Sequence, residues 1–152
     1  MPAVTRLPVI RVQAVRERGA IYPANLDGPA RLAAAARALI GDEDRECFVV
    51  LHLTHKNAIV SAEIIGRGTL CATLVHPREV FKGAILANAG AIALAHNHPS
   101  GDPTPSPEDR ELTRNLIEAG NILGIQVVDH VVIAESRHCS LREACADITG
   151  WR

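Results

Sequence analysis

The stretch "LAHNHPSGDPTPSPEDR", residues 94–110, places two histidines one residue apart directly after an apolar run. The run "AIALAHNH", residues 91–98, is short and apolar, which is typical of a central strand buried on both faces. Residues two apart in a strand project from the same face, with Cα atoms roughly 6.5–7 Å apart. His96 and His98 are therefore able to converge on one ion, and imidazole nitrogen is a common zinc ligand.

A third ligand is needed, because a catalytic zinc keeps three protein ligands and one open position. Asp109, eleven residues after His98, is the candidate, and the intervening loop is stiffened by prolines. Ser106 and Asp109 also form an S-x-x-D pattern, with Pro107 at the first helical position, which is typical of a capping box. A capping carboxylate turns back to its own helix, whereas a ligand turns toward the histidines. The sequence leaves both roles open.

The patterns on either side predict strands and helices that do not strictly alternate. Strands are expected over 9–15, 46–53, 58–65, 91–98 and 125–134. Helices are expected over 30–41 and 77–90, from Ser106 onward, and briefly from Ser140, with an extended, glycine-broken segment between 66 and 77. We therefore expect an α/β or α+β fold, in which one sheet is flanked by helices.

Composition narrows the class of protein. A chain of 152 residues suits one domain, and 47% hydrophobic but only 3% aromatic residues predict an aliphatic core. A net charge of −1 gives no general attraction to nucleic acid, and there are few rings to stack bases. The chain shows neither a long apolar run nor a secretory signal, so we expect a cytoplasmic protein without a membrane partner. The four cysteines form no C-x-x-C pair and are expected to be buried small side chains.

Four stretches resemble a known family. "HNHPSGDPTPSPED" at 96–109 matches the zinc motif of the JAMM (MPN+) metalloproteases, which is His-x-His-Pro, six residues, then Ser-x-x-Asp. Three further stretches resemble the RadC-like branch of that fold: "VHPREVF" at 75–81, "VDHVVIA" at 128–134 and "GDEDRECFVVLHL" at 41–53. Proteins of this branch are called DNA repair proteins. The resemblance covers about residues 9–145.

The resemblance implies a domain organisation. It implies an MPN (JAMM) domain with a mixed sheet and a cytidine-deaminase-like architecture over 28–152, preceded by a strand-and-loop extension over 1–27. Longer RadC-like proteins carry a helix-hairpin-helix domain, and we expect none in this chain.

The resemblance also implies roles for single residues. His96, His98 and Asp109 would bind zinc, and the hydroxyl of Ser106 would stabilise an oxyanion. The family supplies a glutamate from an earlier strand, and counting back from "GTL" puts Glu63 in that place. A charge inside an apolar strand needs a reason, although an exposed residue at the edge of the sheet is the alternative.

The chemistry implied is that of a zinc metallopeptidase or isopeptidase acting on a protein or peptide substrate. Glu63 would take a proton from a water activated by Zn²⁺. The alternatives are a non-catalytic MPN module that binds a protein or DNA partner, and a zinc nuclease in DNA repair or recombination. A nucleobase deaminase is excluded, because it needs a C-x-x-C motif.

Two further places carry open interpretations. His130, next to Asp129 in "VVDHVVIA", belongs either to a pair that orients a ligand or to the core, bonded to backbone. His76 and Arg78 either face a substrate carboxylate or phosphate, or serve the start of a helix on the surface.

Overall fold

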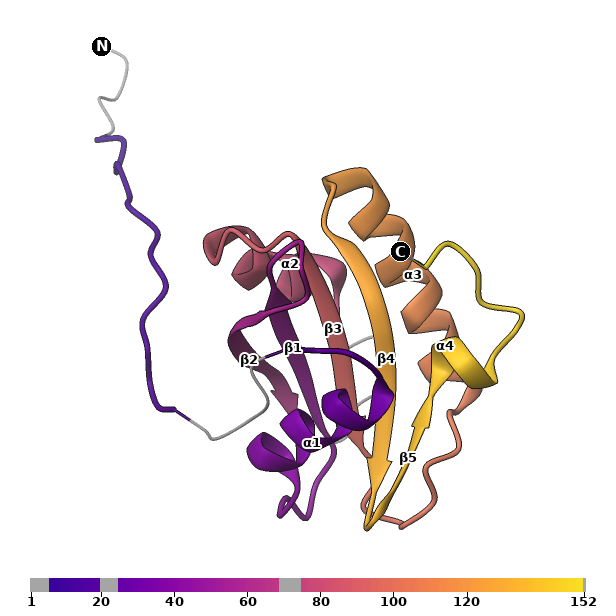
Figure 1. The fold of residues 1–152 in the computed structure, drawn as a ribbon. Coiled ribbons are helices and arrows are strands. Elements are labelled where there is room, and N and C mark those ends of the chain that lie inside the picture. Colours follow the sequence, from indigo (N-terminus) through magenta and orange to yellow (C-terminus); the bar gives the residue numbers. More distant parts are fainter. Residues whose placement is uncertain (1–5, 20–24, 69–74, 152) are drawn as a thin grey trace.

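A five-stranded mixed sheet with helices on both faces forms the body of the protein (Figure 1). The computed structural model describes residues 6–19, 25–68 and 75–151. The strand order is β2-β1-β3-β4-β5, which confirms the prediction of a mixed sheet flanked by helices. The elements are α1 (Pro29–Ile40), β1 (Cys47–Leu53), β2 (Ile59–Arg67), α2 (Pro77–Leu86), β3 (Ala91–Asn97), α3 (Pro107–Leu123), β4 (Gln126–Ala134), β5 (Arg137–Ser140) and α4 (Leu141–Ala144).

The pairing of the three central strands determines which strand ends lie side by side. β1 is antiparallel to both β2 and β3, whereas β3 and β4 are parallel and β5 returns antiparallel to β4. Phe48 near the start of β1 therefore lies opposite His96 near the end of β3, and Val132 of β4 lies on the other side of His96. The end of β3 is thus enclosed by two neighbouring strands.

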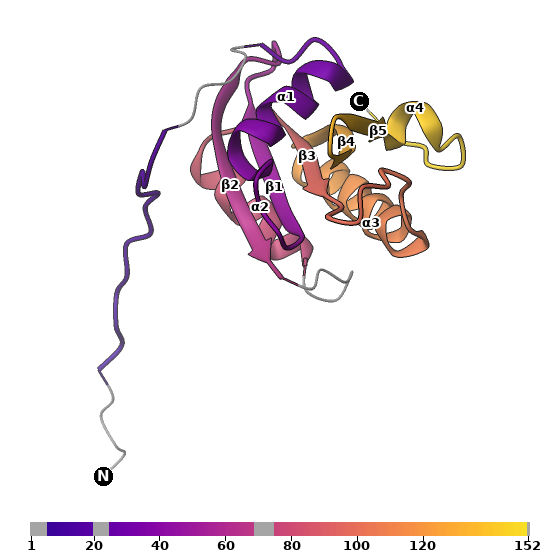
Figure 2. The ribbon, with the colours of Figure 1, turned by 90° about the horizontal axis from the view of Figure 1, so that it is seen from below.

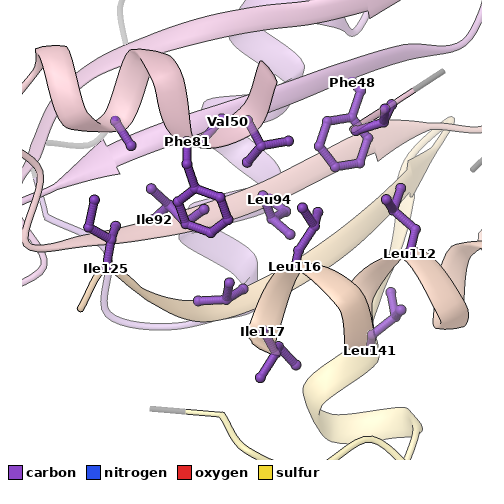
Figure 3. Packing of buried hydrophobic residues seen from close by; sticks show 14 of the residues in the cluster. Phe48, Val50, Phe81, Ile92, Leu94, Leu112, Leu116, Ile117, Ile125 and Leu141 are labelled. Carbon is purple, nitrogen blue, oxygen red and sulfur yellow. The ribbon is translucent and has the colours of Figure 1, made fainter. Parts of the chain in front are cut away.

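The two faces of β3 carry different side chains. Its alanines, Ala91, Ala93 and Ala95, pack in the core beneath α1, where small residues let the helix approach closely. Ile92 and Leu94 pack in the opposite core, against Phe81 of α2 and Leu116 of α3 (Figure 3). Figure 2 shows α1 and α3 on opposite sides of the sheet. Because alternate residues share a face, His96 points to the α3 side.

The expected strand over 9–15 is wrong. Residues 6–19 form neither helix nor strand, and they extend away from the body (Figures 1 and 2). Val9 is 95% exposed and Ile10 78%, despite the alternating pattern. A strand needs a neighbour to bond its N–H and C=O groups, and no described strand pairs with this segment.

Other predicted elements differ in smaller ways. The helix expected over 77–90 ends at Leu86, because Asn88 adopts a positive φ of 53°. The sequence did not predict β5, whose residues alternate poorly. Most of the extended segment expected between 66 and 77 lies outside the described residues. In the described ranges, no helix has the length and apolar character needed to cross a membrane.

Candidate metal centre

Three ligand atoms gather where β3 ends and α3 begins. The Nε2 atoms of His96 and His98 are 3.0 Å apart, and Oδ2 of Asp109 is 3.3 Å from each. Bonds of about 2.0–2.1 Å to a tetrahedral zinc put ligand atoms about 3.3 Å apart, so both the donor types and their spacing fit that ion. Within the ranges that the structure describes, no other group of three or more metal-binding side chains gathers in this way.

The end of the sheet positions the two histidines. His96 is stacked on the ring of Phe48, with centroids 6.1 Å apart, and its side chain is 3% exposed. His98 lies just beyond β3, where its backbone N–H donates to the carbonyl of Ile133 at 2.8 Å. Its Nδ1 lies 2.8 Å from the carbonyl oxygen of Asp102, which only accepts, so Nδ1 carries the proton. A neutral His98 therefore presents the lone pair of Nε2 to the centre.

The start of α3 positions Asp109. Oγ of Ser106 accepts from the backbone N–H of Asp109 at 3.0 Å, and Oδ2 of Asp109 accepts from the N–H of Ser106 at 2.8 Å. This reciprocal pair is a capping box with Pro107 in the first turn. The same Oδ2 atom faces both histidines, so the capping geometry and the orientation expected of a ligand occur together.

The surroundings of Asp109 favour an ionised carboxylate. Burial alone would raise the pKa of Asp109, but the neighbouring imidazole groups of His96 and His98 bring this pKa well below its ordinary value. The neighbouring carboxylate of Asp109 in turn raises the pKa of His98, against the effect of burial. The centre therefore holds a negative charge beside two imidazoles, which suits a cation.

A second carboxylate approaches from the chain just before β1. Oε1 of Glu46 is 4.0 Å from Nε2 of His98, and among the described residues only Asp109 and Glu46 bring a carboxylate within 4.0 Å of these histidine nitrogens. Asn97 holds the backbone on both sides of Glu46. Its Oδ1 accepts from the N–H of Cys47 at 2.6 Å, and its Nδ2 donates to the carbonyl of Arg45 at 2.9 Å.

The structure does not bring Glu63 to this centre. Glu63 lies opposite Val50, and its carboxylate occupies the space where a side chain on Gly83 of α2 would begin. Burial raises the pKa of Glu63, against the attraction of the Lys82 ammonium group. The role of Glu63 as general base thus stays a prediction without a contact that supports it. Glu46 was not predicted from the sequence. The one signal for it in the sequence is a carboxylate directly before an apolar strand.

A buried histidine lies beneath the ligands. His130 is 0% exposed, and its Nε2 lies 2.7 Å from Nδ1 of His96. Its Nδ1 lies 2.7 Å from Oγ1 of Thr113, and burial lowers the pKa of His130 well below its ordinary value. These contacts favour the ligand-orienting interpretation. The carboxylate of Asp129 accepts from the backbone N–H of His130 at 2.7 Å and from the hydroxyl of Ser140 at 2.8 and 2.9 Å, so it contacts the backbone of His130 and not its ring.

The residues at the start of α2 act locally. His76 is the N-cap of α2, and its Nδ1 accepts from the backbone N–H of Arg78 at 3.1 Å. This contact matches the helix-start interpretation of the pair, and it leaves a role for the Arg78 guanidinium in substrate binding as a prediction.

Comparison with known proteins gives one family. A family model described as "RadC-like JAB domain" matches residues 26–146. A UPF0758 protein of Syntrophomonas wolfei is 49% identical over 121 residues, which cover 77% of this chain and 52% of that protein. A UPF0758 protein of Rubrobacter xylanophilus is 50% identical over 121 residues, covering 80% of this chain and 50% of that protein. The chain spans about half the length of the curated relatives it matches.

Proposed function

We propose that this chain, which belongs to the RadC-like JAB domain family, is a zinc-dependent hydrolase that cleaves an amide bond in a protein or peptide. One observation carries the proposal: two imidazole nitrogens and a carboxylate oxygen stand at tetrahedral spacing, with a second carboxylate beside them. Three protein ligands leave a fourth position for water or substrate, which is the pattern of catalytic zinc sites, whereas structural sites have four protein ligands.

The residues around the centre divide the chemistry between them. Zinc held by His96, His98 and Asp109 would supply a Lewis acid and lower the pKa of a water to about 7. Glu46, as the nearby carboxylate, accepts the proton of the attacking water and returns it to the leaving nitrogen. Ser106 uses a lone pair on the N–H of Asp109, so its hydroxyl proton remains able to donate to the developing negative charge of the substrate carbonyl.

Two matched variants test this assignment. Glu46→Gln and Glu63→Gln each replace one carboxylate by an amide of the same shape. Zinc content is measured for both, and cleavage of peptide and isopeptide substrates is followed by mass spectrometry. Glu46→Gln should keep zinc and lose roughly 10²–10⁴-fold in kcat, the usual contribution of a general base, whereas Glu63→Gln keeps the rate. The opposite ranking would assign the base to Glu63, and purified protein that binds no zinc would contradict the proposal.

The same variants separate the other function classes. A non-catalytic module that binds a protein or DNA partner would keep its full biological activity in Glu46→Gln. A zinc nuclease would cleave phosphodiester bonds and leave amide bonds intact. The net charge of −1 gives the nuclease no electrostatic support, which is why the amide substrate is preferred.

A further inference from the structure

We propose that His130 and Thr113 are positioning residues that determine which ring nitrogen of His96 carries the proton. The inference rests on the proposed zinc site and assigns a role to residues that do not themselves face the ion. It follows from three short contacts that run from His96 back to the first turns of α3.

The contacts form a chain inside the core. Nδ1 of His96 is 2.7 Å from Nε2 of His130, and Nδ1 of His130 is 2.7 Å from Oγ1 of Thr113. Oγ1 of Thr113 is in turn 2.6 Å from the backbone carbonyl oxygen of Asp109. Thr113 and His130 are both 0% exposed, so bulk water does not compete for these bonds.

The last contact sets the direction of all the others. A carbonyl oxygen only accepts, so the hydroxyl of Thr113 must donate its single proton to Asp109. Oγ1 is then an acceptor for His130, whose Nδ1 carries a proton. Complete burial favours the neutral ring, so Nε2 of His130 has a lone pair and accepts from Nδ1–H of His96. Nε2 of His96 is consequently the unprotonated nitrogen, and it is the atom that faces the centre.

The opposite direction would block the site. It would put a proton on Nε2 of His96, the atom 3.0 Å from Nε2 of His98 and 3.3 Å from Oδ2 of Asp109. A protonated nitrogen cannot bind a metal. His98 reaches the same protonation through the carbonyl of Asp102, so both histidines are held as Nδ1–H tautomers by a backbone carbonyl at the end of their contacts.

Asp109 contributes to both ends of this series of hydrogen bonds. Its carboxylate is one of the three candidate ligands, and its backbone carbonyl accepts the proton that fixes the tautomer of another. Correct formation of the first turn of α3 thus prepares two ligands together. This coupling explains why a threonine, which bonds back to the carbonyl four residues earlier, stands inside the helix at this point.

Thr113→Val and Thr113→Ser form the test. Valine keeps the shape of threonine and removes the hydroxyl, which leaves Nδ1–H of His130 without its acceptor. The direction of the hydrogen bond between His130 and His96 is then no longer fixed. Zinc affinity is measured by competition with a chromophoric chelator, and folding by thermal denaturation without zinc. We expect Thr113→Val to fold and to lose 10–100-fold in zinc affinity, as for other outer partners of metal-binding histidines, while Thr113→Ser keeps the wild-type affinity. Unchanged affinity in folded Thr113→Val would overturn the inference.

A spectroscopic measurement on the unmodified protein covers the case in which Thr113→Val does not fold. Long-range ¹H–¹⁵N correlation spectra of zinc-free protein report the tautomer of each ring. His96 and His130 should both be protonated at Nδ1, and a proton at Nε2 of His96 would overturn the inference. If wild-type protein binds no zinc, the proposed function fails, but these spectra still decide the proton positions.

Discussion

The two structural roles of Asp109 are separable by comparing Asp109→Asn with Asp109→Ala. Oδ2 of Asp109 accepts from the N–H of Ser106 at 2.8 Å and faces the nitrogens of His96 and His98 at 3.3 Å. Asparagine keeps an oxygen for the amide of Ser106 but loses the charge. Alanine loses both the oxygen and the charge, so the difference between the variants isolates the capping bond.

The expected magnitudes follow from these contacts. Without zinc, Asp109→Ala should be less stable than Asp109→Asn by about 1 kcal/mol, the net contribution of one hydrogen bond at a helix start. In a chain of this size that difference is about 2–4 °C in Tm. The lost interaction of the charge with the helix dipole is common to both variants and cancels in the comparison. Zinc at 100 times its Kd should stabilise the wild type by about 2.7 kcal/mol, and both variants far less.

Thermal denaturation in chelator and in excess zinc measures both effects. Equal Tm values for the two variants in chelator would show that the capping bond contributes nothing. A gain with zinc in Asp109→Asn as large as in the wild type would show that the carboxylate is not a ligand. Either result refutes the corresponding half of the reasoning.

Three further predictions concern one residue beside the centre, Asn97, and two residues elsewhere in the fold, His52 and Gly120. Asn97→Asp keeps an oxygen for the chain before β1 but loses the donor to the carbonyl of Arg45, so kcat should fall while zinc content is kept; a rate unchanged in steady-state assays contradicts this. Burial lowers the pKa of His52 to about 4, so between about pH 6.5 and 4 the unfolded chain binds a proton that the folded chain does not. Stability should therefore fall as pH falls through this window, by up to about 3 kcal/mol, and urea titrations of His52→Gln should show a flatter profile. Gly120→Ala would press a methyl group against the carbonyl oxygen of Ile125, so urea titration should show a loss of about 1–3 kcal/mol; wild-type stability would exclude the clash.

The features predictable from the sequence are those whose cause is local. The S-x-x-D pattern and Pro107 predict where α3 begins, because the capping bonds join residues that are close in sequence, Ser106 and Asp109. The apolar run before His96 predicts a fully buried strand for the same reason, and β3 is buried along its whole length. Spacing within these two elements singled out His96, His98 and Asp109, and the resemblance to the JAMM motif implied their role as ligands.

The features that the sequence did not predict depend on partners elsewhere in the chain. Residues 9–15 have a strand-like pattern, but a strand also needs a neighbouring strand for its backbone hydrogen bonds. In the described sheet, no strand pairs with this segment. β5 is the opposite case, a strand that forms without a strand-like pattern. Its four residues alternate poorly, yet they form a strand because the turn after β4 lays them along that strand. Pairing determined the outcome in both cases, against the local pattern.

The carboxylate beside the centre shows why register has to be known. Alternation places Glu63 on the correct face, but it pairs with Val50, which pairs with Leu94, two residues before His96. Two strand spacings across and two residues along put Cα of Glu63 roughly 12 Å from that of His96, beyond the reach of a glutamate side chain. Extending the antiparallel register of Phe48 and His96 by two residues puts Glu46 directly opposite His98, on the same face and one strand away. In an antiparallel pair, the residues just before one strand meet those just after the other, so the carboxylate that completes a strand-end site is to be sought ahead of the neighbouring strand.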